Sequence, residues 1–363
     1  MTESVYKRLA KRLDEFPQGY PATQKGTELK ILEKLFTPEE AEWALKLKNI
    51  PETVETLAER LGKPVSEMQA ILDNLAAKGL IGAGLLGGQQ VYLLVQFVMG
   101  FLEDATLKTM TPEIAQLIEE YMPDIMPVWG GFQPCEARVV PVNTAINAEH
   151  QVLRYEDVHR MIEEAKSFCV RKCWCRTEKA AAGHPCKHSR LEVCLTFSDE
   201  EGEFEKYPFF GRIISKEEAF KILAVAEEEG LIHMTWNVQQ GQAFICNCCT
   251  CSCGLLRGLK EFNQHGLVAK SNFVSSIGQE RCTACGVCVD DERCMMDAIV
   301  KEDDTYKVLA ERCIGCGVCT SICPTEAIKL LRKPESKQDT PPTEYLDFCL
   351  KRAANRGIEL KLE

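Results

Sequence analysis

One cysteine pattern occurs twice near the C-terminal end of the sequence. Residues 280–288 read ERCTACGVC, residues 311–319 read ERCIGCGVC, and a further cysteine, Cys323, stands directly before Pro324. Thiolates at this spacing bring three sulfur atoms onto one turn-rich loop, which is the ligand arrangement of iron–sulfur clusters. The pattern therefore predicts one-electron chemistry at iron.

Each copy of the pattern has a glycine directly after its second cysteine. We expect the backbone at Gly286 and Gly317 to approach cluster sulfur closely, so both are predicted cofactor-binding positions. A zinc ribbon, which also uses two CxxC units, is the structural alternative. It explains the pattern poorly, because zinc takes four thiolates and eight cysteines are available here, as two triplets and the single residues Cys294 and Cys323.

A second concentration of cysteines lies between residues 156 and 256, which contain ten of the 20 cysteines. Five of these fall within residues 246–253, and core packing does not explain such a density, because a buried structural cysteine usually occurs singly. We predict a further metal centre here, a third [4Fe-4S] cluster, with zinc as the alternative. Its ligands would come from a pool of nine residues: Cys173, Cys175, Cys186, Cys194, Cys246, Cys248, Cys249, Cys251 and Cys253.

The pool does not define one ligand set. Adjacent Cys248 and Cys249 cannot easily bind one small cluster without strain, so we expect some thiols to serve different metals, or none. His184 and His188 flank Cys186 and could add to a zinc site, but the spacing is not that of a zinc finger and solvent exposure is the simpler interpretation. Two isolated cysteines, Cys135 and Cys349, are predicted to be packing residues.

Helical patterns flank these cysteines. Apolar residues in 158–165 predict a helix before Cys169, and Ser215-x-x-Glu218 is a capping box that predicts a helix ending at Gly230. We expect these two helices to form the scaffold that brings the cysteine groups together.

The N-terminal part predicts helices followed by a hairpin. Residues 29–47 read as a packed helical pair and 53–61 as a short helix. Ser66-x-x-Gln69 reads as a capping box opening a helix to residue 77, and 80–81 and 91–95 read as strands. This order resembles a winged helix. DNA binding is not favoured, because Lys78 is the only basic residue that the second helix would present.

Composition limits the remaining possibilities. The chain has 363 residues, enough for two or three domains, and its net charge of -11 is unfavourable for binding a polyanion. The sequence opens Met1-Thr2-Glu3-Ser4 with no signal-peptide pattern, so we expect reduced thiols and a cytoplasmic location. The longest apolar stretch, 91–102, is shorter than the ~20 residues that span a bilayer. No phosphate-binding, dinucleotide-binding or haem motif is present, so nucleotide and flavin cofactors are not indicated.

From about residue 271 to 333 the sequence closely resembles the bacterial-type two-cluster ferredoxins. The repeat continues beyond the triplets, because Cys294-x-x-x-Ala298 aligns with Cys323-x-x-x-Ala327. The resemblance implies two [4Fe-4S] clusters with crossed ligand sets. One set would be Cys282, Cys285, Cys288 and Cys323, and the other Cys294, Cys313, Cys316 and Cys319.

The first half of the repeat departs from the ferredoxin pattern. Residues 289–293 place five residues where three are usual, and Met295 stands where proline is expected. Because the register resumes at Ala298, we interpret this as a small loop insertion.

The arrangement as a whole resembles a group of multidomain iron–sulfur proteins of anaerobic bacteria and archaea, which implies no settled activity. We predict an α+β multidomain fold: a helical and winged-helix-like domain (1–125), a cysteine-rich α+β domain (126–270), a ferredoxin-like dicluster domain (271–333), and a linker with a C-terminal helix (334–363).

The predicted function is single-electron transfer to or from a partner protein, a flavin or metal oxidoreductase. One alternative is a reductase that acts on a small substrate at the middle-domain cluster, where three thiolates would leave one iron open. A second alternative is a redox-sensing DNA-binding regulator.

Overall fold

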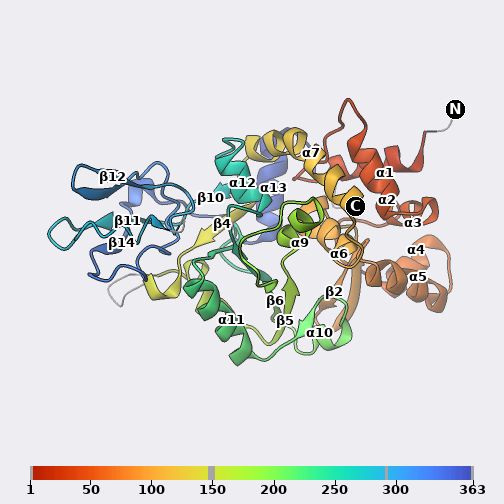
Figure 1. Ribbon diagram of the computed structural model, residues 1–363. Coiled ribbons are helices and arrows are strands. Elements are labelled where there is room, and N and C mark those ends of the chain that lie inside the picture. The colour runs from red at the N-terminus through yellow and green to blue at the C-terminus, as the bar shows by residue number, and fades with distance from the viewer. Residues whose placement is uncertain (1–2, 146–151, 291–292, 361–363) are drawn as a thin grey trace.

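The computed structural model describes residues 3–145, 152–290 and 293–360 (Figure 1). Its α-helices are α1 (Val5–Asp14), α2 (Thr27–Leu35), α3 (Pro38–Ala44), α4 (Val54–Leu61), α5 (Val65–Ala77), α6 (Leu102–Thr106), α7 (Pro112–Gly131), α8 (Val158–Glu164), α9 (Trp174–Ala181), α10 (Glu203–Lys206), α11 (Lys216–Glu228), α12 (Gly254–Lys260) and α13 (Tyr345–Arg356). Its strands are β1 (Glu52–Thr53), β2 (Gly82–Leu86), β3 (Gln89–Leu93), β4 (Ala137–Val140), β5 (Ser167–Lys172), β6 (Glu192–Ser198), β7 (Arg212–Ile213), β8 (Ile232–Trp236), β9 (Phe244–Cys248), β10 (Val268–Ala269), β11 (Phe273–Ile277), β12 (Ile299–Glu302), β13 (Thr305–Val308) and β14 (Ile328–Arg332).

The N-terminal part is helical with one small sheet, in the strand order β1-β3-β2. Thr53 caps α4 by accepting a hydrogen bond from the backbone of Thr56, and Gly62 ends the helix at φ 64°. The predicted capping box at Ser66 was wrong. Helix α5 begins at Val65 with Pro64 at its N-cap and no side-chain cap, because proline already fixes the φ angle at the helix start. The winged-helix interpretation of α4, α5 and the β2–β3 hairpin stays a prediction.

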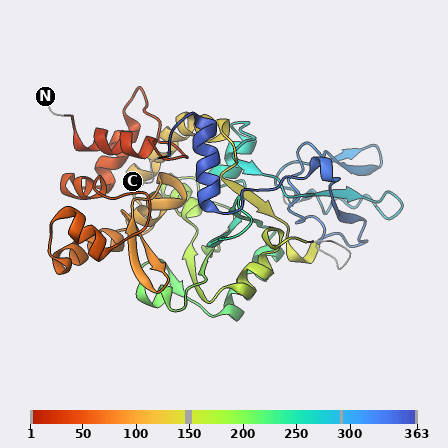
Figure 2. The same ribbon diagram turned by 180° about the vertical axis from the view of Figure 1, so that it is seen from behind.

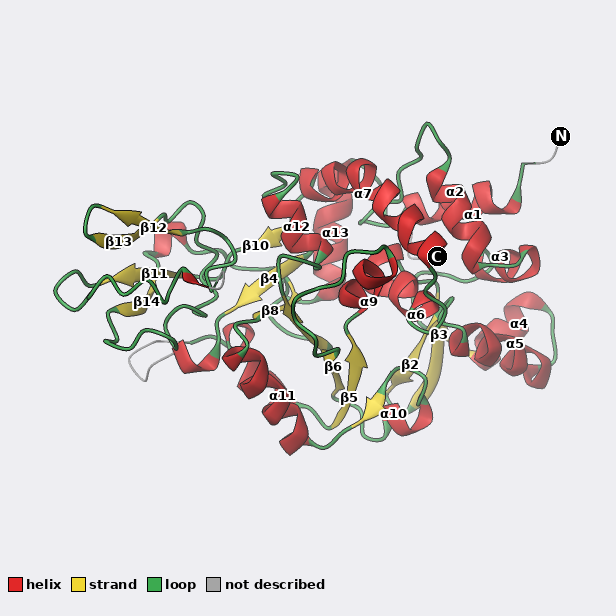
Figure 3. Cartoon of the chain, in the orientation of Figure 1, coloured by secondary structure: helices red, strands yellow, loops and turns green. Residues whose placement is uncertain are grey.

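A seven-stranded sheet forms the centre, in the order β10-β4-β8-β9-β6-β5-β7. All its pairs are antiparallel except β10 with β4. Helices α8 and α11 pack on one side against β5 and β6. Helix α7 contacts both α9 and α12 on the other side (Figure 3). The chain is therefore a mixed helix-and-sheet fold whose central sheet is covered on both faces.

A separate lobe follows the central sheet along the chain and projects from it at one end (Figure 1). It consists of two antiparallel strand pairs, β11–β14 and β12–β13, joined by loops. Backbone hydrogen bonds attach the lobe to the body: the Val142 amide donates to the Cys316 carbonyl at 2.9 Å and the Ser271 amide to the Ile314 carbonyl at 3.1 Å. The side chain of Arg293 also donates to the carbonyls of Glu227 and Glu228. The lobe is thus fixed against the body.

Helix α13 returns from the lobe to the body, where it lies across the molecule (Figure 2). Its Arg352 is fully buried and donates to three carbonyls at the end of α7 and just beyond it, those of Trp129, Phe132 and Pro134, at 2.6–2.8 Å. The Arg352 Nε atom also lies 2.8 Å from a carboxylate oxygen of Glu136, which is 1% exposed. This arginine therefore anchors the C-terminal helix. Among the described residues, no helix has both the length and the apolar character to cross a membrane.

Replacing Arg352 with methionine should destabilise the protein by about 3–5 kcal/mol, because Glu136 would remain as an uncompensated buried carboxylate. Replacing the neighbouring exposed Lys351 with methionine is the control, and its surface pair with Asp347 should contribute at most about 0.5 kcal/mol. Anaerobic urea unfolding followed by circular dichroism measures both. Equal shifts in the two unfolding midpoints would contradict the anchoring role.

Candidate metal centres

Four cysteines of the lobe surround an outer cavity. Cys282, Cys285, Cys288 and Cys323 line it together with Gly286 and Tyr306. Cys285 is exposed, whereas burial raises the pKa of Cys288 to about 11. Gly286 has φ 83°, a conformation that side-chain-bearing residues rarely adopt, and it turns the backbone toward the cavity.

Four other cysteines surround an inner cavity, on the side of the lobe that faces the body. Cys294, Cys313, Cys316 and Cys319 line it, together with Ile232 of the central sheet. Burial raises the pKa of Cys319 to about 12 and also raises that of Cys316. The amide of Ala298 donates to the sulfur of Cys294 at 3.3 Å, as an amide would to a metal-bound thiolate.

The structure therefore brings together, around two separate cavities, the same two crossed quartets that the ferredoxin resemblance implies. Thiolate donors and backbone amides are the chemistry that a [4Fe-4S] cluster requires, so the residues present fit that group. The insertion at 289–293 leaves Cys294 in the inner quartet, although residues 291 and 292 lie outside the described part. Met295, at the expected proline position, is buried and lines the inner cavity.

One glycine of the second copy was not singled out from the sequence. Gly315 has φ 71°, and a Cβ atom there would lie 2.2 Å from the carbonyl oxygen of Phe273. The loop of the inner quartet therefore packs directly on β11. Gly317, by contrast, was predicted, and its φ of 75° also requires glycine.

Comparison with known protein families finds a match for one segment of the chain. Residues 306–329 match the 4Fe-4S binding domain family. The chain therefore contains an iron–sulfur, ferredoxin-type domain near its C-terminal end, and that domain binds a 4Fe-4S cluster. The matched segment includes the second cysteine triplet and Cys323. No curated protein and no solved structure matches the chain.

The nine cysteines of the middle pool separate into two groups. Six form a closed ring in which each thiol interacts with two neighbours. Around the ring, the order is Cys173, Cys175, Cys253, Cys248, Cys246, Cys194 and back to Cys173. The remaining three, Cys186, Cys249 and Cys251, meet at a second place. We call these groups the thiol ring and the thiol triad.

Strand pairing places half of the ring. Cys246 and Cys248 are two residues apart on β9, so both side chains leave the same face of the sheet. The register of β6 with β9, in which Leu195 pairs with Ile245, sets Cys194 beside Cys246. Contacts with Cys194 and Cys248 lower the pKa of Cys246 to about 5.

Two of the other ring cysteines lie at the N-terminal ends of helices. Cys173 is the N-cap of α9 and Cys253 is the N-cap of α12. The N-terminal ends of both helices therefore lie at the ring. Neighbouring thiols lower the pKa of both cysteines, because they donate hydrogen bonds to the thiolate: Cys175 and Cys194 act on Cys173, and Cys175 and Cys248 act on Cys253.

Adjacent Cys248 and Cys249 belong to different groups, the first to the ring and the second to the triad. Between the groups lies Arg176, which is 1% exposed and interacts with Cys173, Cys249 and Cys186. Sequence reasoning did not identify this arginine as a site residue. Its position directly after Cys175 was the only signal in the sequence.

A buried polar network contacts β9 on the face of the sheet opposite Cys246 and Cys248. The Asn247 side chain contacts His233 Nδ1 at 2.6 Å and donates to the Val193 carbonyl, and His233 Nε2 lies 3.3 Å from Glu227. Asn247 and His233 are fully buried. The network fixes the register of the strand that carries Cys246 and Cys248, and its members lie far apart in the sequence, so no local pattern indicated it.

The other cysteines lie outside both groups. Cys135, Cys169 and Cys349 are buried, and burial raises the pKa of all three. Of the two histidines that flank Cys186, His184 is exposed and His188 is half-buried, with its backbone amide 3.4 Å from the Cys186 sulfur.

The crossed ligand sets make a specific prediction for serine variants. Cys323→Ser should alter the same paramagnetic signal as Cys282→Ser, since both residues line the outer cavity, while Cys294→Ser should alter the other signal together with Cys313→Ser. Electron paramagnetic resonance of the reduced protein distinguishes them. If Cys323→Ser changed the signal affected by Cys313→Ser, the ligand sets would be sequential and not crossed.

The buried carboxyl group of Glu178 should make the stability of the protein depend on pH. It is 2% exposed on α9, and burial, with Glu119 nearby, raises its pKa from 4.5 to about 8. The folded state therefore binds a proton that the unfolded state releases, and this contribution to stability is complete below pH 4.5 and is lost as the pH rises to 8. Glu178→Gln should remove this pH-dependent loss of stability. The difference in unfolding midpoint between the variant and wild type at pH 5, 6.5 and 8 measures it. Parallel pH curves for the two proteins would contradict the assignment.

Proposed function

We propose that this chain is an electron-transfer protein, or the electron-transfer subunit of an oxidoreductase complex. It would hold two [4Fe-4S] clusters at the outer and inner quartets and a third iron–sulfur centre at the thiol ring. When bound, such clusters supply one-electron carriers whose potentials depend on ligands, hydrogen bonds and solvent exposure. The residues of the chain would hold these groups and set their order.

The observation that carries the proposal is a shared strand contact. Ile232 lines the inner cavity, and in the β8–β9 register it pairs with Cys248 of the thiol ring. Ile232 is 1% exposed, so a buried side chain lies at this junction of the two sites. The inner quartet therefore lies between the outer quartet and the ring, which is the order that a relay requires.

The outer quartet is the entry or exit point. Cys285 is exposed and the lobe projects from the body, so a partner can approach the outer cavity directly (Figure 1). The net charge of -11 suits selection of a partner by complementary charge, which mainly raises the encounter rate. We propose a flavin or metal oxidoreductase as that partner.

The thiol ring is better suited to an iron–sulfur centre than to packing. Six neighbouring thiols would repel one another as thiolates unless metal ions compensate their charge. A [4Fe-4S] cluster takes four thiolates, so six allow that cluster with two neighbouring thiols or a larger one. Two helix N-termini directed at the ring favour bound negative charge. Free thiols at this density also require a reducing compartment, which agrees with the cytoplasmic location that we propose.

A DNA-binding role is less favoured. The β2–β3 hairpin, which would be the wing, packs on the middle domain: Tyr207 donates to the Gly84 carbonyl at 3.0 Å, and Glu203 accepts from the Leu85 amide at 3.2 Å. Lys78, the C-cap residue of α5, is paired with Glu40 at 2.5 Å. The hairpin and helix thus serve contacts within the chain.

The test is a rapid-mixing experiment. After mixing with a low-potential one-electron donor protein, freeze-quenched paramagnetic resonance should show the outer and inner clusters reduced before the ring centre. Cys313→Ala removes an inner ligand, so the ring centre should be reduced much more slowly although the outer cluster still is. Cys135→Ala, a buried cysteine outside all the sets, is the matched control. Unchanged reduction of the ring centre in Cys313→Ala, or no ring signal in wild type, would contradict the proposal.

A further inference from the structure

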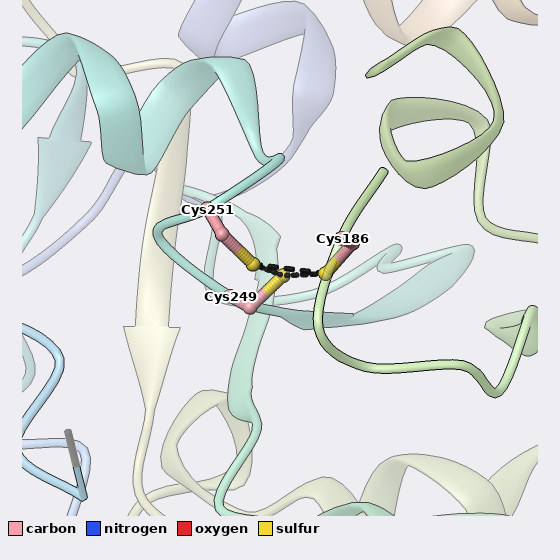
Figure 4. A group of neighbouring side chains, drawn as sticks. All are labelled: Cys186, Cys249 and Cys251. Carbon is pink, nitrogen blue, oxygen red and sulfur yellow. Dashed lines mark hydrogen bonds between the residues drawn. The ribbon is translucent and has the colours of Figure 1, made fainter. Parts of the chain in front are cut away.

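The thiol triad has a geometry different from that of the two quartets. Its sulfur atoms are in direct contact, at 2.8 Å between Cys186 and Cys251, 3.1 Å between Cys249 and Cys251, and 3.5 Å between Cys186 and Cys249 (Figure 4). Cys249 and Cys251 come from the turn between β9 and α12, and Cys186 comes from the loop between α9 and β6. Three thiols from two segments more than sixty residues apart therefore point at one another.

These distances suit one metal ion. In a [4Fe-4S] cluster each thiolate binds a different iron, so the sulfur atoms must lie apart. Around one tetrahedral ion with metal–sulfur bonds of about 2.3 Å, neighbouring sulfur atoms lie about 3.8 Å apart. The triad reaches that spacing if each sulfur moves by less than about 1 Å. Three contacting thiols are thus close to the arrangement of a single-ion site.

Charge supports the same conclusion. Three thiolates and one divalent cation carry a net charge of -1, and Arg176, which is 1% exposed, interacts with Cys249 and Cys186. Its Nη2 atom lies 3.5 Å from the Asn247 carbonyl and Nη1 donates to the Arg190 carbonyl, so the guanidinium is held in place. With the arginine the site would be neutral. A neutral site lowers the desolvation cost of partly burying the thiolates.

The triad supplies three ligand atoms, so a metal ion bound there would need a fourth ligand. Among the described residues, the group contains three ligand atoms and no fourth His, Cys, Asp or Glu ligand within 4.8 Å of all of them. Cys249 is 2% exposed, but Cys186 and Cys251 are half-buried and the residues next to Cys186, Pro185 and Lys187, are exposed. The site is therefore buried on the side of Cys249 and accessible to solvent on the side of the Cys186 loop.

We propose that Cys186, Cys249 and Cys251 bind one Zn²⁺ ion whose fourth ligand is exchangeable and is taken from solution, a water or a small thiol. A protein zinc site with three ligands and one open position is the arrangement of catalytic zinc, and a thiol that binds there releases its proton to solvent and becomes a thiolate. The substrate class that this site fits is a small thiol. The proposal does not depend on the electron-transfer function, because the ring and the quartets are separate groups.

Metal analysis of the anaerobically purified full-length chain tests the site. Wild type should contain about one zinc per chain in addition to its iron, while Cys186→Ser and Cys251→Ser should lose that zinc and keep their iron. Cys169→Ser, a buried cysteine outside the triad, is the matched control and should keep both metals. Two triad variants from different segments guard against misfolding of one of them, and retained iron reports that each is folded.

Cobalt substitution tests the geometry and the open position. Protein produced in zinc-depleted, cobalt-supplemented medium should show the intense visible bands of tetrahedral Co²⁺ and sulfur-to-cobalt charge transfer, both absent from Cys186→Ser. Adding 2-mercaptoethanol should shift these bands, because its thiolate takes the fourth position.

Three outcomes would overturn the proposal. Loss of about four irons per chain from the triad variants would make these thiols cluster ligands. Wild type without zinc, in which Cys186 and Cys251 form a disulfide on mild oxidation, would make them a redox pair. Cobalt bands that do not respond to the added thiol would mean that the fourth position is closed.

Discussion

The position of β9 between β8 and β6 is the constraint on which the metal-binding arrangement depends. Side chains alternate along a strand, so the register that directs Cys246 and Cys248 into the ring directs Asn247 to the opposite face, and a slip of one residue would exchange them. The same pairing sets Cys194 beside Cys246 and Ile232 opposite Cys248. The buried contact between Asn247 and His233, at 2.6 Å, stabilises this register on the opposite face of the sheet. One strand thus fixes both the ring and its distance from the ferredoxin-type lobe.

Accumulated thiol charge is the second constraint. Seventeen thiols gather in four groups, namely the two quartets, the ring and the triad, and each group would oppose folding if it became ionised without a counter-charge. The chain supplies part of that charge through two helix N-termini at the ring and Arg176 between ring and triad. Metal ions would supply the remainder. Folding of the cysteine-rich part of the chain and metal binding are therefore expected to be coupled, because metal ions would offset the charge of so many neighbouring thiolates.

The sequence was most informative where ligands lie close together in the chain. The second cysteine triplet and Cys323 indicated an iron–sulfur domain, and the match of residues 306–329 to the 4Fe-4S binding domain family confirms it. The division of the nine middle cysteines could not be predicted, because Cys194 and Cys186 reach their groups only through sheet order and a long loop. Arg176 and Gly315 were missed for the same reason, since their roles depend on contacts with Cys249 and Phe273 that no local spacing encodes. The start of α5 was misplaced because proline at position 64 replaced the expected serine cap.

Iron and acid-labile sulfide per chain, measured on the full-length protein after strictly anaerobic purification, test the central claim most directly. Two quartets and a ring centre predict about twelve or more irons with a comparable amount of sulfide. About eight of each would contradict the account, because the ring would then hold no iron–sulfur centre and no relay into the middle domain could exist.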